Sequence, residues 1–243
     1  SSESPEEAVI VIFCSLPVVF MSADGREIMQ RKARRHDGDA FVLKNEPLDV
    51  FVDLIRTKTR RGRALEASMT TDSMTGLLRH AVFKDRLDTE VGRCRRQDDA
   101  LACVMLDIDH FKSINDRHGH ATGDRVIQGL ARLLRRRFRA TDLVGRYGGE
   151  EFALAILQTT ADRARDLVDD LRRRFSSLVF ATPSGTLTAT FSAGIATYPA
   201  CDSRDELLVA ADEALYAAKQ AGRNRVRVYE PSSGRASGSR AAS

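Results

Sequence analysis

Two short apolar runs, at residues 143–144 and 152–157, flank the glycine pair Gly148-Gly149. Paired glycines between strand-like runs indicate a hairpin, because glycine adopts positive φ without a clash of its missing Cβ atom. The two residues after the glycines are acids, Glu150 and Glu151. The pattern therefore predicts an exposed turn that carries carboxylates and leaves room for a charged ligand.

A third apolar run, at residues 101–106, has the continuous pattern of a buried strand. It ends in Asp107 and Asp109, and α/β folds place their chemistry where strands leave the core. A polar stretch at residues 111–124 follows, and residues 126–134 then show the apolar spacing of a helix. These patterns predict a second group of functional residues beside the hairpin.

The N-terminal part reads as strand, helix and strand at residues 16–23, 28–35 and 40–44, which indicates a parallel α/β unit. Residues 47–70 have roughly helical apolar spacing and are predicted to form a linker helix. Its apolar stripe is short and broken, so both a plain linker and a lever or dimer stalk remain open.

The C-terminal part alternates as one strand over residues 186–197 and is helical over residues 202–221. A last strand is predicted at residues 226–229. The tail, residues 231–243, is rich in Ser, Gly, Ala and Arg, and we expect it to be disordered.

Composition fits a soluble globular protein of one large or two small domains: 243 residues, 42% hydrophobic and 30% charged. The net charge is +4, but the arginines form short clusters on helical patterns without a nucleic-acid motif. Solvated helix faces explain them, and we expect no nucleic-acid partner.

We expect no membrane-spanning segment, no membrane partner and no metal site made of cysteine thiolates. The apolar run at residues 8–21 is too short to span a bilayer and contains Pro17. The four cysteines lack metal or redox spacing, which favours free thiols in a cytoplasmic protein.

Several motifs together resemble one known family. They are Asp107-Ile108-Asp109-His110-Phe111-Lys112, Asn115-Asp116, Gly119-His120, Gly123-Asp124 and Gly148-Gly149-Glu150-Glu151-Phe152. In order and spacing they resemble the GGDEF family of diguanylate cyclases, from about Asp72 to Tyr229. The resemblance implies an α/β domain over residues 71–230, with a central mixed sheet flanked by helices.

The resemblance implies condensation of two GTP into cyclic di-GMP, with release of pyrophosphate, by a homodimer. Asp107, Glu150 and the Ile108 carbonyl would hold Mg²⁺ or Mn²⁺, two ions per GTP site. Glu150 and Glu151 would be the catalytic carboxylates. Product inhibition would act through Arg139 and Asp142, the family's Arg-x-x-Asp site.

Seven residues would bind the substrate by the same resemblance. They are Phe111, Lys112, Asn115, His120, Asp124, Lys219 and Arg223. A carboxamide and a carboxylate, Asn115 and Asp124, can read the donors and acceptors of guanine. Lys219 and Arg223 are four residues apart, so we expect them on one helical face toward the triphosphate.

The resemblance also implies an ion pair between Asp72 and Arg146. Arg79 and His80 depart from the Asn-Arg that the family usually has at these positions.

Residues 1–46 resemble the C-terminal half of a response-regulator receiver domain of two-component signalling. Ser22 would be the switch hydroxyl, Phe41 the switch aromatic residue and Lys44 the phosphate-contacting lysine. The family's phosphoacceptor aspartate would lie upstream of residue 1, so we expect no phosphorylation of these residues at that site.

Three alternatives compete with an active cyclase. One is a catalytically silent module that binds cyclic di-GMP, but such modules usually lose the acids that this chain retains at Asp107 and Glu150. Another is a signalling fragment whose activity depends on the missing receiver half. A cyclase for a different purine is disfavoured by Asp124, because adenine lacks the donors that a carboxylate would accept.

Overall fold

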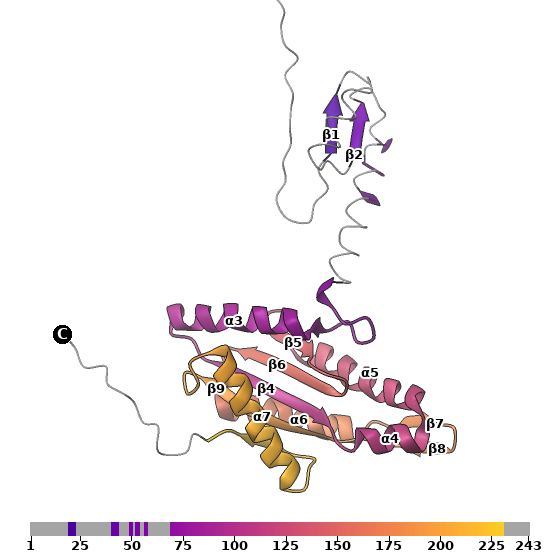
Figure 1. The fold of residues 1–243 in the computed structure, drawn as a ribbon, viewed down its shortest axis with the longest axis vertical. Coiled ribbons are helices and arrows are strands. Elements are labelled where there is room, and N and C mark those ends of the chain that lie inside the picture. The colour runs from indigo at the N-terminus through magenta and orange to yellow at the C-terminus, as the bar shows by residue number, and fades with distance from the viewer. Residues whose placement is uncertain are drawn as a thin grey trace, which may run out of the picture. The chain divides into compact units, whose positions relative to one another are not determined.

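The structure, a computed structural model, describes residues 19–22, 40–43, 49–50, 52–53, 56–57 and 69–230. The chain divides into two compact units, Ser1–Thr70 and Thr71–Ser243 (Figure 1). Each unit is described by itself.

The first unit contains two paired strands, β1 (Val19–Ser22) and β2 (Ala40–Leu43). They are parallel, with Val19 opposite Ala40, and this confirms the predicted parallel pairing. Lys44, the helix expected between the strands and most of the linker helix lie outside the described residues, as does the tail after residue 230. The receiver half therefore stays a prediction.

The second unit is built around one mixed sheet. Its elements are β3 (Leu78–Arg79), α3 (His80–Gln97), β4 (Leu101–Ile108), α4 (Phe111–His118), α5 (His120–Arg137), β5 (Leu143–Arg146), β6 (Glu151–Leu157), α6 (Ala161–Ser176), β7 (Phe180–Thr182), β8 (Gly185–Leu187), β9 (Phe191–Tyr198), α7 (Arg204–Gln220) and β10 (Val226–Val228). The six-stranded sheet has the order β10-β9-β4-β6-β5-β3. Only the outer pairs, β10 with β9 and β3 with β5, are parallel, so the predicted mixed sheet is confirmed.

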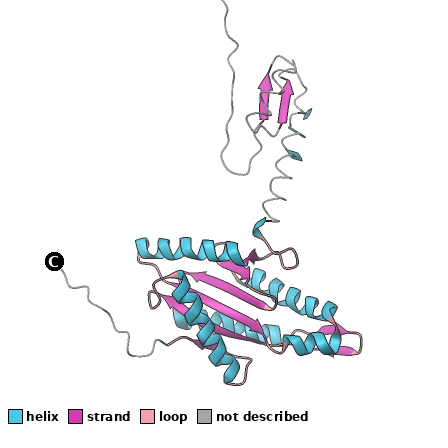
Figure 2. Cartoon of the chain, viewed as in Figure 1, coloured by secondary structure: helices cyan, strands magenta, loops and turns pink. Residues whose placement is uncertain are grey.

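Helices cover both faces of this sheet (Figure 2). One core lies between the sheet and helices α5 and α6, and the other between the sheet and helices α3 and α7. Alternate residues of β4 serve the two cores: Val104 and Leu106 pack in the first, Cys103 and Met105 in the second. Burial on both faces explains the unbroken apolar run of this strand.

The strand expected at residues 186–197 is in fact two strands, so that prediction was wrong. β8 pairs with β7 in a separate two-stranded hairpin, and β9 joins the main sheet. Between them, the carbonyl of Thr190 accepts a hydrogen bond from the amide of Asp109, 2.9 Å away. The chain is therefore bound at Thr190 to the residue that follows β4, and β8, before this point, pairs only with β7 in the exposed hairpin.

Three of the four cysteines, Cys94, Cys103 and Cys201, lie in the described region and are buried free thiols, as predicted. Burial raises the pKa of Cys103 to about 12. None of the helices in the described residues has the length and apolarity needed to cross a bilayer.

The close packing of α7 on β9 generates a first prediction. A Cβ atom on Gly194 would overlap the carbonyl oxygen of Ala211 and the amide nitrogen of Leu215, both of them backbone atoms. We expect Gly194→Ala to lower the free energy of unfolding by about 3 kcal/mol, because the helix backbone cannot rotate away as a side chain can. Urea denaturation measures the change.

Gly92→Ala is the matched control, because Gly92 lies within α3 and a Cβ there would meet only the end of the Arg96 side chain. It should raise stability by about 0.5–1 kcal/mol, the gain in helix propensity. Equal effects of the two substitutions would contradict the packing argument.

Candidate active site

The turn between β5 and β6 carries the glycine pair, and the predicted hairpin is confirmed. The amides of Tyr147 and Gly148 both donate to the carbonyl of Glu151, at 2.8 and 3.2 Å. The expected reason for the glycines was wrong, since neither Gly148 nor Gly149 has positive φ. A Cβ on Gly148 would instead overlap the Glu151 carboxylate, whereas the space beside Gly149 is open.

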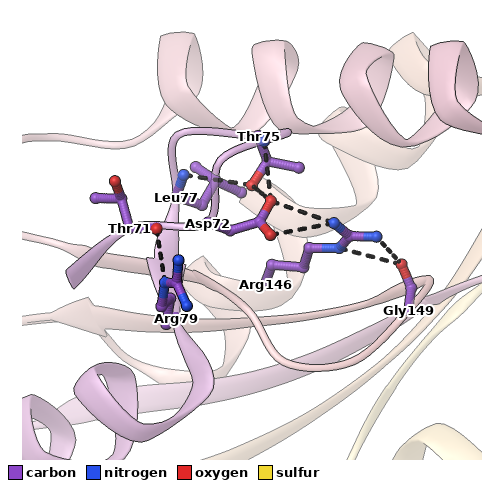
Figure 3. Close-up of polar contacts among 7 residues, drawn as sticks. All are labelled: Thr71, Asp72, Thr75, Leu77, Arg79, Arg146 and Gly149. Atoms are coloured by element: carbon purple, nitrogen blue, oxygen red, sulfur yellow. Dashed lines mark hydrogen bonds and ion pairs between the residues drawn. The ribbon is translucent and has the colours of Figure 1, made fainter. Parts of the chain in front are cut away.

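Arg146 holds this turn through both ends of its guanidinium group (Figure 3). Nη1 donates to both carboxylate oxygens of Asp72 at 3.2 Å, which confirms the predicted ion pair. Nε and Nη2 donate to the carbonyl of Gly149 at 3.2 and 2.8 Å. One side chain therefore connects the start of the second unit to the tip of the hairpin.

Asp72 is fixed in turn by Thr75, whose amide and hydroxyl donate to its carboxylate at 2.9 and 2.7 Å. Partial burial acts to raise the pKa of Asp72. Hydrogen bonds from Thr75, together with the charge and hydrogen bonds of Arg146, outweigh burial, and the pKa lies below its ordinary value. The carboxylate is thus held as an ion.

The two residues that depart from the family pattern have structural contacts of their own. Arg79 donates from Nε to the carbonyl of Thr71 at 2.8 Å. The ring centroids of His80 and Tyr147 lie 4.0 Å apart. The ring of Phe83 packs edge-on against the same Tyr147 ring. These residues support the strand that leads into the turn.

Carboxylates from two strands meet at this edge of the sheet. Asp107 of β4 is paired directly with Glu151 of β6, and the Ile108 amide donates to the carbonyl of Glu150 at 3.4 Å. Burial raises the pKa of Asp107, although Lys219 opposes this effect. Burial also raises the pKa of Glu151, and the charge of Asp107 adds to the shift.

Lys219 of α7 supplies a positive charge to this acidic edge, with Nζ 2.9 Å from Oδ2 of Asp107. Among the described residues, no three His, Cys, Asp or Glu side chains lie close enough together to hold a metal ion. The predicted ligand set is smaller, with two carboxylates and one carbonyl. Its oxygen donors suit a hard divalent cation, and the contact with Lys219 shows that Asp107 accommodates a cation.

The residues predicted to bind guanine lie on two consecutive helices. Phe111, Lys112 and Asn115 belong to α4, while His120 and Asp124 belong to α5. Lys112, His120 and Asp124 are exposed. The helices are joined at Gly119, which has φ of 79° and donates to the carbonyl of Asn115.

Asn115 has a buried side-chain oxygen, Oδ1, without a hydrogen-bond partner among the described residues. Gly123 lies so close that a Cβ atom there would overlap this oxygen. A buried acceptor without a donor is unfavourable, so the site is suited to a ligand that brings an N–H group.

Lys219 and Arg223 do not share a helical face, and that prediction was wrong. α7 ends at Gln220, and Gly222 has φ of 107°. The amides of Gly222 and Arg223 donate to the carbonyls of Lys219 and Ala218, the hydrogen-bond pattern of a Schellman motif. Arg223 therefore lies in the turn that follows the helix.

Arg139 and Asp142 line a separate cavity of about 320 Å³. Its other lining residues are Glu90, Arg93, Thr141, Leu157 and Gln158. The carboxylate of Asp142 accepts from the amides of Arg139 and Leu157, at 3.0 and 3.1 Å. Asp142 thus has a structural role in addition to any role in binding.

The sequence profile described as diguanylate cyclase, GGDEF domain, matches residues 69–225. The chain belongs to this GGDEF family. It is 40% identical over 158 residues to the diguanylate cyclase DgcP of Pseudomonas aeruginosa, a match that covers 65% of the chain and 24% of DgcP. It is 38% identical over 179 residues to the response regulator PleD of Caulobacter vibrioides, covering 72% of the chain and 39% of PleD.

The fold is shared with a solved GGDEF domain, that of DgcB from Caulobacter crescentus in complex with c-di-GMP. The TM-score is 0.65 at 36% identity, and the match covers 67% of this chain and 94% of that one. The chain spans less than half the length of DgcP and PleD.

The sequence did not point to Arg93 as a neighbour of the GGDEF domain's Arg-x-x-Asp pair. Arg93 lies on α3, and only the fold brings it into the cavity that Arg139 and Asp142 line. It is held by Glu90 at 2.7 Å and by Asp99 at 3.2 Å. An arginine in an amphipathic helix has no sequence signal that separates a binding role from a solvated one.

The contacts of Arg146 generate the second prediction. We expect Arg146→Ala to destabilise the GGDEF domain by about 1–2 kcal/mol near neutral pH, because Asp72 and the Gly149 carbonyl lose their partner. Arg146→Lys should recover only part of the loss, since an ammonium group cannot reproduce the two-sided contact. Urea denaturation of all three proteins gives the comparison.

The pH dependence of this difference has a definite sign. Because the folded-state pKa of Asp72 is lowered, its contribution is present above the unfolded-state pKa, ordinarily 3.8. It is lost as the pH falls through the folded-state value. A difference between wild type and Arg146→Ala that stays constant through that range would contradict the assignment to Asp72.

Proposed function

We propose that the GGDEF domain of this chain is a diguanylate cyclase, which condenses two GTP into cyclic di-GMP and releases two pyrophosphates. The observation that carries the proposal is the acidic edge, where Asp107 and Glu151 lie opposite each other and Lys219 contacts Asp107. Two comparisons support the same reaction: the similar protein DgcP is named a diguanylate cyclase, and the similar GGDEF domain of DgcB was solved with c-di-GMP bound.

Mg²⁺ or Mn²⁺, two ions per GTP site, would be held by Asp107, Glu150 and the Ile108 carbonyl. Bound metal would neutralise charge on the triphosphate and on the leaving pyrophosphate. The oxygen donors fit such ions. The raised pKa values of Asp107 and Glu151 indicate that the edge gains from added positive charge.

Guanine would be bound by the α4–α5 residues. The unpartnered Oδ1 of Asn115 would accept from a guanine N–H group, and Asp124 would accept from another. Phe111, Lys112 and His120 would line the same pocket. The proposed discrimination against adenine follows from the two acceptors, which adenine's ring edge does not match.

Lys219 and Arg223 would donate to the triphosphate oxygens. In the reaction, the 3′-hydroxyl oxygen of one GTP attacks the α-phosphorus of the other, and the bond to the β-phosphate oxygen breaks. Glu150 would accept the hydroxyl proton as the general base, and Glu151 beside it would be an additional carboxylate for the metal ions. Each domain holds one GTP, so two copies must face each other to react.

The cavity at Arg139 and Asp142 is proposed to bind cyclic di-GMP and to mediate product inhibition. Arginine can donate to a guanine edge and to phosphate, and Asp142 can accept from guanine N–H groups. Arg93 lines the same cavity and adds a second guanidinium group. We also propose that residues 1–46 are the C-terminal half of a receiver, as PleD's description as a response regulator supports.

The decisive assay incubates purified protein with GTP and Mg²⁺ and measures pyrophosphate and cyclic di-GMP. We expect product from the wild type and at least about a hundredfold slower reaction from Glu150→Gln, which keeps the side-chain shape but loses the charge. Omission of divalent ions should abolish product. Sedimentation establishes the oligomeric state of the same sample.

Two outcomes would contradict the proposal. A folded, dimeric wild type without product would leave nucleotide binding as the surviving function, which is the silent-module alternative. Equal rates for the wild type and Glu150→Gln would remove Glu150 from the chemistry.

Product binding is tested by calorimetry with cyclic di-GMP. Arg139→Ala should weaken binding by about tenfold or more, because a charge-assisted contact is lost. Arg136→Ala is the matched control, since Arg136 is an exposed arginine near the end of α5 that does not line the cavity. No binding by the wild type would exclude product inhibition through this cavity.

A further inference from the structure

Asp109 is a buried carboxylate to which the proposed reaction gives no role. Its exposed fraction is 4%. Oδ1 accepts from the hydroxyl of Ser192 at 2.7 Å. Oδ2 accepts from the hydroxyl of Thr190 at 2.7 Å and from the amide of Asn224 at 3.0 Å.

The bond to Asn224 reaches an unusual piece of backbone. Arg223 and Asn224 are consecutive residues in the left-handed region, with φ of 61° and 46°. Residues with a Cβ atom are uncommon in this region, although Asn adopts it more readily than Arg does. The amide of Asn224 is fixed by Asp109, 115 positions earlier in the chain.

The same turn is held from a second side. Arg172 of α6 donates from Nη1 to the side-chain oxygen of Asn224 at 2.9 Å, and its Nε contacts Asp169 at 2.7 Å. Arg223 itself is anchored through its amide to Ala218, its carbonyl accepts from Nε of Arg225 at 3.0 Å, and the residue is exposed. The contacts of Asn224 hold the same turn on the side that faces Asp109 and α6.

The two aspartates at the end of β4 differ in what surrounds them. Both oxygens of Asp109 are engaged by hydroxyl and backbone donors, whereas Oδ2 of Asp107 contacts the ammonium group of Lys219. A buried carboxylate is unfavourable unless donors satisfy it, and its donors here belong to β9, its preceding loop and the turn after α7. This distribution is suited to holding loops in place.

We propose that Asp109 is a positioning residue that fixes the Arg223-Asn224 turn and thereby sets the affinity for the triphosphate. The inference rests on the proposed function, because it takes Arg223 as a phosphate contact. Asp109 acts only through the backbone of Asn224. It links the strand that carries Asp107 to the turn that carries Arg223.

The test compares two ligands by calorimetry. One is 3′-deoxyguanosine triphosphate, which lacks the attacking hydroxyl and cannot condense, and the other is guanosine, which lacks phosphates. We expect Asp109→Asn to weaken triphosphate binding about five- to tenfold and to change guanosine binding less than about twofold. Asn keeps the shape of the side chain, but it loses the charge and replaces one acceptor oxygen by an NH2 donor, which weakens the set of contacts that holds Asn224.

A double-mutant cycle with Arg223→Ala tests the route. If Asp109 acts through Arg223, the double variant should bind the triphosphate no more weakly than Arg223→Ala alone. Additive losses would overturn the inference, as would an equal loss for guanosine. If Arg223→Ala binds the triphosphate normally, Arg223 has no phosphate role and the inference falls with it. If Arg223→Ala weakens triphosphate binding but Asp109→Asn does not, the inference about Asp109 is overturned and the phosphate role of Arg223 stands.

A matched pair of milder variants keeps the test valid if Asp109→Asn does not fold. Thr190→Val removes the hydroxyl that shares Oδ2 with Asn224, and Ser192→Ala removes the hydroxyl on Oδ1. We expect a selective loss of triphosphate affinity, about twofold to threefold, from Thr190→Val and less from Ser192→Ala. Equal effects of the two variants would contradict the proposal.

Discussion

Carboxylates at one edge of the sheet create a need for positive charge, and the rest of the site depends on it. Asp107 and Glu151 are opposite each other on paired strands, where burial raises the pKa of both. Like charges in a half-buried place are stable only if a cation lies near them. Lys219 provides one from α7, and the close packing of α7 on β9, without a side chain at Gly194, brings that helix within reach.

The turn that carries Glu150 is held from outside the hairpin. Short hairpin connections are stabilised largely by local geometry, but here the Gly149 carbonyl is bound by a guanidinium group that is itself fixed by Asp72. The open space beside Gly149 is thereby kept without any side chain of the turn occupying it. The turn is therefore fixed by Arg146 and Asp72 while the space beside Gly149 stays open to a ligand.

Much of this could be predicted from the sequence, because the relevant signals are local. The run at β4, the hairpin and the Asp72–Arg146 pair were all visible as periodicity or motif. What could not be predicted depends on tertiary contacts. Helical spacing placed Arg223 on α7, but the helix ends at Gln220, Gly222 has positive φ, and the Asp109 contact holds the turn that follows. The glycine pair predicted the turn correctly for a wrong reason, since the crowding by Glu151 is visible only in three dimensions.

Asp72 lies 74 positions before Arg146 and immediately after the boundary between the two units. It precedes the first strand of the main sheet, so a domain limit chosen from sheet and core residues alone would omit it. A fragment cut there would retain every carboxylate of the acidic edge and still lose the anchor of the hairpin tip. Truncated versions of this protein should therefore keep the residues just upstream of β3. The shortest fragment that retains the hydrophobic core is shorter than the shortest fragment that also retains the anchor of the site.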